Sequence, residues 1–370
     1  MANKWLTRLT SDFGQVAAKM PRPTDSVIQL PSPSLNWAIG NNGLIEGKAI
    51  CFYGGESGGK SLLMQLTIIE IQKKHSEGIC ILFDAEYAFN PDWFEKLGGD
   101  LERLIVRQTN EPKMIFDYIK GEMLELVQEG CPIKAIAIDS VKSIKYPKDE
   151  KKETTDMVMG GAGASYLGSA LKHVTPVIRE NNITCILVQQ VYEEMDQYKK
   201  MRNPYIVPDG RALKHFCDYM AQVDKLETKD NIVEVGKDVA GLAAQIGHKV
   251  RVKFKKNRCG APYRVAQFTL DYTAGIVNKE EEIFDLAKSI GVIYHPVNSE
   301  TGKPNNMYWK FGTYDQVKGE DATKAWVVGS KKVQEELMTA CNNHKDAPVK
   351  LDATGTVIDD VDGIDLDAEG

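Results

Sequence analysis

The sequence contains no apolar run long enough to cross a membrane, and its N-terminus shows no basic segment followed by an apolar one. These absences predict a cytoplasmic protein that makes no membrane contact. The seven cysteines form no CxxC pair, and Cys51, Cys80 and Cys185 lie inside apolar, strand-like runs. We therefore expect small buried side chains in a reducing compartment, without a disulfide or a cysteine metal site.

The chain also lacks a large excess of charge of either sign once its end is set aside. It has 46 Lys and Arg against 52 Asp and Glu, which gives a formal net charge of −6. Seven of the acids fall in the last twenty residues, which hold no Lys or Arg, so residues 1–350 carry 46 bases and 45 acids. We expect residues 345–370 to be a disordered acidic tail. It either keeps the protein soluble or mimics a nucleic acid and competes for a basic surface on the body.

Apolar strand-like runs alternate with helical patterns through residues 36–278. This alternation predicts an α/β fold with a mostly parallel sheet flanked by helices. Residues 1–35 form a lead-in with four prolines and a β-like piece, SVIQL, which is a strand of this domain or an arm lent to another subunit. Residues 279–344 predict a small α+β unit with two helical stretches. The expected strands of the main unit are 49–53, 79–83, 135–138, 184–188 and 249–255.

Two long polar stretches, residues 142–163 and 191–210, interrupt this alternation. Each follows directly after an expected strand, and each contains scattered Lys, Met and Tyr. Long irregular insertions in a compact domain are usually functional or disordered.

The segment GGESGGKS, at residues 54–61, fits the phosphate-binding pattern GxxxxGK[ST], with an apolar strand before it and a helix after it. Its glycines allow backbone N–H groups to face a phosphate, and the helix N-terminus adds the positive end of its dipole. Lys60 would reach the β- and γ-phosphates, and Ser61 would ligate Mg²⁺. The sequence thus predicts a site for ATP and Mg²⁺ that includes Gly54, Glu56, Ser57, Gly58, Gly59, Lys60, Ser61 and Leu62.

Three polar residues at or just after other expected strands complete this prediction. Asp139 ends the run AIAID and would supply the carboxylate near Mg²⁺. Glu86 could face the γ-phosphate and align a water, although a helix cap or a surface acid is an equal interpretation. Gln190 could donate to the γ-phosphate and pull on the stretch that starts beside it, so that the position of this loop would report the state of ATP.

Residues 253–258 read KFKKNR, with four cationic side chains in six positions. A basic run of this kind is usually a solvated edge strand. Nothing nearby in the sequence supplies an anion for it.

Together these motifs resemble the RecA family of recombinases, and within it the phage UvsX-like branch. The resemblance runs from about Ser34 to Cys341. It is carried in order by SLNWAIGNNGLIEGKAICFYGGESGGKS, DAEYAFNPDWFEKLG, AIAIDS, ILVQQV, DGRALKHF and VRVKFKKNRCGAPYR.

The resemblance implies a RecA-type P-loop core at residues 36–278, preceded by a polymerisation segment at 1–35. It implies a DNA-dependent ATPase that polymerises as a helical filament on single-stranded DNA and catalyses homologous pairing and strand exchange in recombination and repair. Double-stranded DNA is then a second partner. A phage member would work in the host cytoplasm, with a recombination mediator and a single-strand DNA-binding protein.

The resemblance also implies roles for individual residues. Glu86 matches the catalytic base and Gln190 the γ-phosphate sensor. Asn90 and Trp93 match the pair that contacts adenine, and Tyr272 joins the nucleotide-binding set.

The basic run gains a specific role from the same resemblance. Lys256 and Arg258 match two lysines that reach the γ-phosphate on the neighbouring subunit, where they act like an arginine finger. Arg258 keeps the charge and adds a forked donor. Lys253 and Lys255 stay open between a solvated and a DNA-facing role.

The resemblance implies that the two polar stretches are DNA-binding loops. It also implies that SVIQL is a strand that docks onto the adjacent subunit, and that residues 279–344 gather duplex DNA. Lys side chains can bind DNA phosphates, and Met and Tyr side chains can wedge or stack between bases. Each of these Met and Tyr residues could equally pack against other parts of the protein. The residues expected at DNA are Lys172, Met157, Met159, Met195, Tyr198, Lys199, Lys200, Arg202 and Arg211, and Tyr205 is a further stacking candidate.

Three positions depart from the family pattern. Ser165 and His215 stand where Arg and Phe are often found, and Asp209 stands in place of a Gly. These departures bear on the interface and on the strength of DNA binding rather than on the class of activity. Two alternatives remain. A RecA-fold ring helicase would also contain carboxylates like Glu86 and Asp139. A small-molecule kinase would not need the basic run at residues 253–258.

Overall fold

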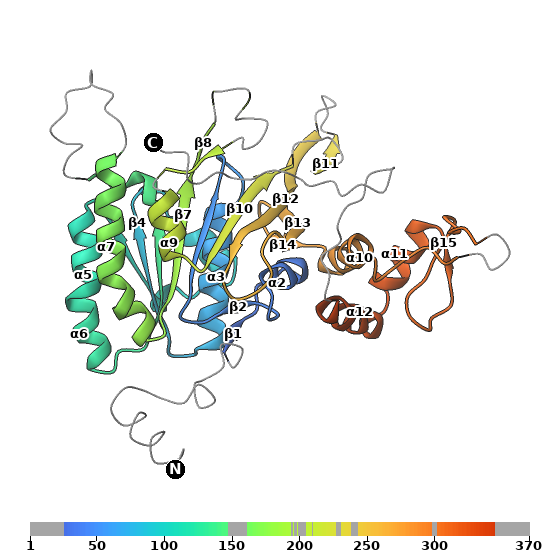
Figure 1. Ribbon diagram of the computed structural model, residues 1–370, viewed down its shortest axis with the longest axis horizontal. Coiled ribbons are helices and arrows are strands. Elements are labelled where there is room, and N and C mark those ends of the chain that lie inside the picture. Colours follow the sequence, from blue (N-terminus) through green and yellow to red (C-terminus); the bar gives the residue numbers. More distant parts are fainter. Residues whose placement is uncertain are drawn as a thin grey trace, which may run out of the picture.

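The computed structural model describes residues 26–146, 161–193, 195, 198, 205–208, 210–226, 231–237, 243–297 and 302–344. At its centre lies a ten-stranded sheet in which the strand order is β14-β13-β12-β10-β3-β7-β6-β4-β5 and β11 pairs with β12 (Figure 1). The strands from β10 to β5 run parallel. They are β3 (Ala49–Gly54), β4 (Ile79–Asp84), β5 (Leu104–Gln108), β6 (Ile133–Asp139), β7 (Thr184–Gln190) and β10 (Tyr219–Lys225).

Helices cover both faces of this sheet (Figure 1). One face carries α5 (Pro112–Lys120), α6 (Glu122–Gln128), α7 (Gly161–Glu180) and α9 (Gly210–Phe216), whose apolar side chains form one core cluster with the strands. The other face carries α2 (Pro33–Ile39) and α3 (Lys60–Lys74), which belong to a second cluster. Because both faces are covered, β3 is buried along its whole length. The expected α/β fold with a mostly parallel sheet is confirmed.

The remaining strands extend the sheet antiparallel beyond β10. They are β11 (Ile232–Lys237), β12 (Ala243–Asn257), β13 (Val265–Asp271) and β14 (Gly275–Val277). The strand expected at 249–255 is therefore part of a longer one. Val250, Val252 and Phe254 are buried while Arg251 is exposed, an alternation typical of a strand with one covered face.

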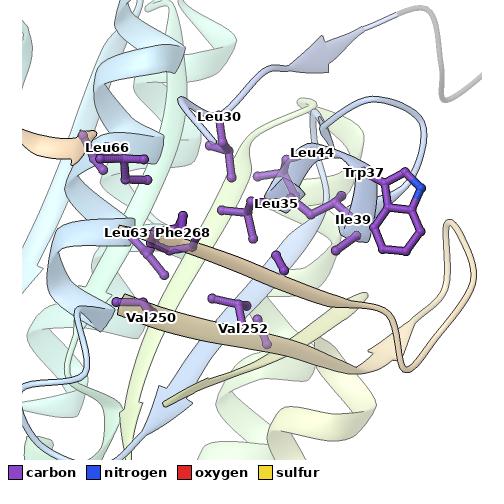
Figure 2. Packing of buried hydrophobic residues seen from close by; sticks show 14 of the residues in the cluster. Leu30, Leu35, Trp37, Ile39, Leu44, Leu63, Leu66, Val250, Val252 and Phe268 are labelled. Carbon is purple, nitrogen blue, oxygen red and sulfur yellow. The ribbon is translucent and has the colours of Figure 1, made fainter. Parts of the chain in front are cut away.

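Figure 2 shows side chains of α2 and of α3 packed next to one another on the antiparallel strands. Leu35 and Ile39 of α2 are fully buried. They belong to one cluster with Leu63 of α3, Val252 of β12 and Phe268 of β13. This packing fixes β12 and β13 beside the helix that begins at the end of the GGESGGKS segment.

The piece SVIQL pairs within its own chain. Its central residues form β1 (Val27–Ile28), which is antiparallel to β2 (Leu44–Ile45). Ile28 and Leu30 are buried in the core, and the Asn36 side chain bonds both the N–H and the carbonyl of Leu30, at 2.8 and 2.7 Å. The interpretation of this piece as a strand of its own domain is confirmed, and its docking onto an adjacent subunit stays a prediction.

The C-terminal part of the described chain is mainly helical. It contains α10 (Lys279–Ser289), α11 (Glu320–Val328) and α12 (Lys331–Asn343), with a short ribbon of β15 (Tyr308–Trp309) and β16 (Val317–Lys318). Both expected helical stretches are confirmed. The third helix, α11, was not expected, and its N-cap, Gly319, offers no side-chain bond that could mark its start.

Two polar contacts hold this part to α2. The Trp37 indole N–H donates to the Cys341 carbonyl at 3.0 Å. Glu282 of α10 accepts from the Ser32 hydroxyl at 2.5 Å and from the Ser34 N–H at 2.6 Å. Burial raises the pKa of Glu282 to about 7. The start of α2 and the start of α10 are therefore joined through one buried carboxyl group.

All seven cysteines are free, and Cys51, Cys80 and Cys185 are buried as expected. Among the helices that the structure describes, none has both the length and the apolar character to span a membrane.

Candidate nucleotide and DNA site

The phosphate-binding segment connects β3 to α3 at the carboxyl end of the parallel strands. A Cβ at Gly54 would lie 2.1 Å from the carbonyl oxygen of Val223 in β10, so only glycine fits there. Gly59 is the N-cap of α3 and has a φ of 95°, which is also a glycine conformation. The turn therefore brings the backbone close to the neighbouring strand and leaves the N-terminus of a 15-residue helix facing the site.

Lys60 and Asp139 lie close enough in this site for the charge of each to act on the pKa of the other. Lys60 is buried and donates to the Gly55 carbonyl at 2.5 Å. Burial lowers the pKa of Lys60, against the opposing charges of Asp139 and Glu86. For Asp139 burial raises the pKa to about 6, although a hydrogen bond with Ser61 works the other way.

Asp139 also carries an oxygen suited to a cation. Its Oδ1 atom is buried and has no hydrogen-bond partner. Hard divalent cations such as Mg²⁺ prefer carboxylate and hydroxyl oxygens, and Ser61 lies within hydrogen-bond reach. The residues expected to hold Mg²⁺ are thus brought together and fit the ion. A pocket next to them is lined by Ser61, Met64, Gln65, Leu82, Asp84, Glu86, Ala88, Phe89 and Asp139.

Glu86 and Gln190 meet although they are 104 residues apart. Gln190 Nε2 donates to Glu86 Oε1 at 2.8 Å, and the same oxygen accepts from the Ser140 hydroxyl at 2.5 Å. Gln190 ends β7, Ser140 follows β6, and Glu86 follows β4. Adjacent parallel strands bring their carboxyl ends to one edge, which is why motifs so far apart in sequence converge.

Asp84 supports this edge, a role that the sequence alone did not predict. It is buried, and it accepts from the backbone N–H groups of Ala88 and Phe89 at 3.2 and 3.0 Å. It also accepts from Gln108 at 3.2 Å. These bonds hold the turn that presents Glu86. The position of Asp84 at the end of an apolar strand was a signal that could have identified it.

The three residues expected at the base lie beside this edge. The Asn90 side chain caps α4 (Pro91–Lys96) by accepting from the Trp93 N–H at 3.1 Å, and Trp93 packs partly against the core. The Tyr272 hydroxyl bonds Gln245 at 2.8 Å and His248 at 3.1 Å. A contact with adenine stays a prediction for all three.

Lys256 and Arg258 lie at the opposite end of the sheet from the phosphate-binding turn. Lys256 pairs with Met220 near the start of β10, whereas Val223, which touches Gly54, pairs with Val252. Three residues of β10, about 10 Å, therefore separate Lys256 from the level of the turn. The two cations of the pair cannot serve the phosphate site of their own chain.

Both cations instead lie at the C-terminus of α9. Lys256 donates to the carbonyl oxygens of Lys214 and, at 2.7 Å, Cys217. Burial, helped by the charge of Arg258, lowers the pKa of Lys256 to about 8. Arg258 donates to the His215 carbonyl at 3.2 Å. Cations at a helix C-terminus stabilise its carbonyl groups.

The expected DNA contacts are described only in part. Lys172 on α7 and Arg211 on α9 are exposed. Met195 and Tyr198 are 90% and 86% exposed. The start and end of the second stretch pair as β8 (Tyr192–Glu193) and β9 (Tyr205–Ile206). Five candidates lie outside the described residues, namely Met157, Met159, Lys199, Lys200 and Arg202.

The fold and the site define a P-loop nucleoside triphosphatase. Residues 6–277 match the model of the RecA N-terminal domain. Protein RecA of Tropheryma whipplei is 27% identical over 311 residues, which cover 84% of this chain and 64% of that protein. Protein RecA of Heliobacterium modesticaldum is 30% identical over 281 residues, or 76% of this chain and 74% of that protein. A mitochondrial DNA repair protein recA homolog of Dictyostelium discoideum is 29% identical over 77% of this chain and 61% of its own length.

The chain belongs to the RecA family. RecA-family proteins are DNA-dependent ATPases of recombination and repair, and a nucleotide site is part of that fold.

Proposed function

We propose that the chain is a DNA-dependent ATPase that polymerises on single-stranded DNA and catalyses homologous pairing and strand exchange. The observation that carries this proposal is the contact between Glu86 and Gln190. Glu86 would align the attacking water, and Gln190 would meet the γ-phosphate. Because Gln190 is followed at once by the second predicted DNA loop, the nucleotide and DNA would act on one structural element.

Mg²⁺, when bound with ATP, would neutralise the charge on the β- and γ-phosphates. Ser61 and Asp139 would hold it, Lys60 would bind the phosphates, and Asn90, Trp93 and Tyr272 would bind the base. We also propose that residues 142–163 and 191–210 contact DNA. Residues 1–35 would form the polymerisation segment.

Finer points are also proposals. The resemblance to the UvsX-like branch suggests a phage protein that works in the host cytoplasm with a recombination mediator and a single-strand DNA-binding protein. Residues 279–344 would form a separate small domain that gathers duplex DNA. A ring helicase is not favoured, since the relatives cited above are RecA proteins or a DNA repair protein.

The test is ATP hydrolysis with and without single-stranded DNA, together with a joint-molecule assay between homologous DNAs. We expect DNA to stimulate hydrolysis and joint molecules to form only with ATP, and electron microscopy should show helical filaments. A protein that hydrolyses ATP at the same rate without DNA and pairs no homologous strands would contradict the proposal. Closed rings would revive the helicase.

A further inference from the structure

The side chain of Lys142 lies between the nucleotide site and the second predicted DNA loop. It belongs to η4 (Val141–Ser143), a single 3-10 turn after β6. Its ammonium group donates to Gln190 Oε1 at 3.3 Å and lies 4.2 Å from the centroid of the Tyr192 ring. Lys142 therefore contacts the last residue of β7 and the first residue of β8.

The contact with Gln190 determines which way its amide points. An amide has an acceptor oxygen and a donor nitrogen of nearly the same shape, so its neighbours decide the orientation. Lys142 offers only donors and takes the oxygen. Glu86 offers only acceptors and takes Nε2 at 2.8 Å. The second N–H of the same nitrogen is then the donor that a γ-phosphate oxygen would meet.

Without Lys142 the opposite orientation loses one of its two penalties, and only Glu86 still holds the amide. A reversed amide would turn its oxygen toward the Glu86 carboxylate and the phosphate, both of which repel it. Lys142 is close enough to the phosphate site for its charge to add to the effect of burial in lowering the pKa of Lys60. An anion bound by Lys60 would therefore attract Lys142 as well.

The contact with Tyr192 extends this arrangement to the loop. A cation over an aromatic face is attracted by the negative charge of the ring. Tyr192 is 52% exposed, and Lys142 contacts its ring where the loop begins. If the ammonium group moved toward a phosphate, the ring would lose that contact, and only the pairing of β8 with β9 would hold the start of the loop.

We propose that Lys142 is a positioning residue that orients the Gln190 amide and couples the γ-phosphate to the second loop through Tyr192. This inference rests on the proposed function, since it supplies a physical link between the nucleotide and DNA within that activity. Lys142 is the first residue of the stretch 142–163 that is predicted to contact DNA, and its role at Gln190 is additional to that prediction.

The test compares the affinity for a labelled single-stranded oligonucleotide in a non-hydrolysable ATP analogue and in ADP. The ratio of the two dissociation constants measures the coupling. We expect Lys142→Met to reduce this ratio about fivefold or more, the lower end of ordinary coupling between sites. Lys142→Arg keeps the charge and the donors, and should keep most of the ratio.

Substitutions of Tyr192 test the second half of the link. Tyr192→Phe keeps an aromatic face and should behave as the wild type, whereas Tyr192→Leu should lower the ratio as Lys142→Met does. The matched control is Lys134→Met, which removes a half-buried lysine from the other end of β6. It should leave the ratio unchanged.

The outcomes separate the two proposals. If wild-type hydrolysis does not respond to DNA, the proposed function fails. If the wild type responds and Lys142→Met keeps its ratio, only the role of Lys142 is overturned. Thermal unfolding shows whether Lys142→Met is folded. Should it not fold, equal ratios for Tyr192→Phe and Tyr192→Leu would still overturn the link.

Discussion

At the scale of single residues, Glu86 has the surroundings that a general base needs. One of its oxygens accepts from Ser140, Ser143 and Gln190, at 2.5, 3.3 and 2.8 Å. Donors of this kind fix the carboxylate in place without neutralising it. All three bonds are to the same oxygen, so the second oxygen can accept from a water.

Glu86→Gln should therefore bind ATP and DNA but hydrolyse ATP about 10²- to 10⁴-fold more slowly, the range that general-base catalysis supplies. The amide keeps the shape and one acceptor oxygen but cannot take a proton. Steady-state hydrolysis and nucleotide binding by fluorescence measure the two effects. Glu77→Gln, an exposed acid before the start of β4, is the control. A wild-type rate for Glu86→Gln would remove Glu86 as the base.

At the scale of elements, the sequence predicts those parts in which local pattern and final position agree. The strands of the parallel sheet and the turn at Gly54 follow from buried apolar runs and a glycine pattern. The meeting of Glu86 with Gln190 also follows, because parallel strands end at a common edge. The same reasoning could not identify Lys142, whose contacts depend on how the turn bends after β6 ends, whereas the position of Asp84 at the end of an apolar strand was a usable signal.

The pairing of short strands was less predictable than their existence. SVIQL has a strand pattern, but its partner depends on which apolar surface lies nearest. In the structure that surface is the chain's own core, where Ile28 is buried. Likewise, the alternation of β12 fits an edge strand as well as a strand with neighbours on both sides.

Glu282 makes the link between α10 and α2 dependent on pH. Its pKa rises from 4.5 unfolded to about 7 folded because of burial. A raised carboxyl pKa means that this group stabilises the fold least when it is ionised, so its contribution falls as pH rises from about 4.5 to above 7. Glu282→Gln removes this dependence, while its amide oxygen can still accept from Ser32 and Ser34.

We expect the unfolding free energy of Glu282→Gln, relative to the wild type, to rise by about 2 kcal/mol between pH 5 and pH 8. Urea unfolding at both pH values measures it. Glu280→Gln, on the same turn of α10 but exposed, should show no such trend. If the unfolding free energies of the wild type and Glu282→Gln changed in parallel with pH, burial would not raise the pKa of Glu282 in the folded protein.

At the scale of the whole molecule, the sheet separates the phosphate-binding turn from Lys256 and Arg258. The turn lies at the carboxyl ends of the parallel strands, and the two cations lie near their amino ends. A site that needs both must take them from two copies of the chain. Such a contact joins two different surfaces, and repeating it generates a helical filament or a ring.

A mixing experiment tests this arrangement directly. Lys60→Ala removes the phosphate ligand, and Lys256→Ala removes the cation expected to act on the neighbour, so each variant alone should lack DNA-stimulated hydrolysis. In a random one-to-one mixture, about one quarter of the interfaces combine an intact phosphate site with an intact cation, because each condition holds for about half of the chains. We therefore expect the mixture to recover about a quarter of the wild-type stimulated rate.

Thermal unfolding checks that Lys256→Ala, which loses its contacts to α9, is folded. If the folded variants recover no activity on mixing, or if Lys256→Ala alone retains full stimulated hydrolysis, Lys256 does not act between subunits.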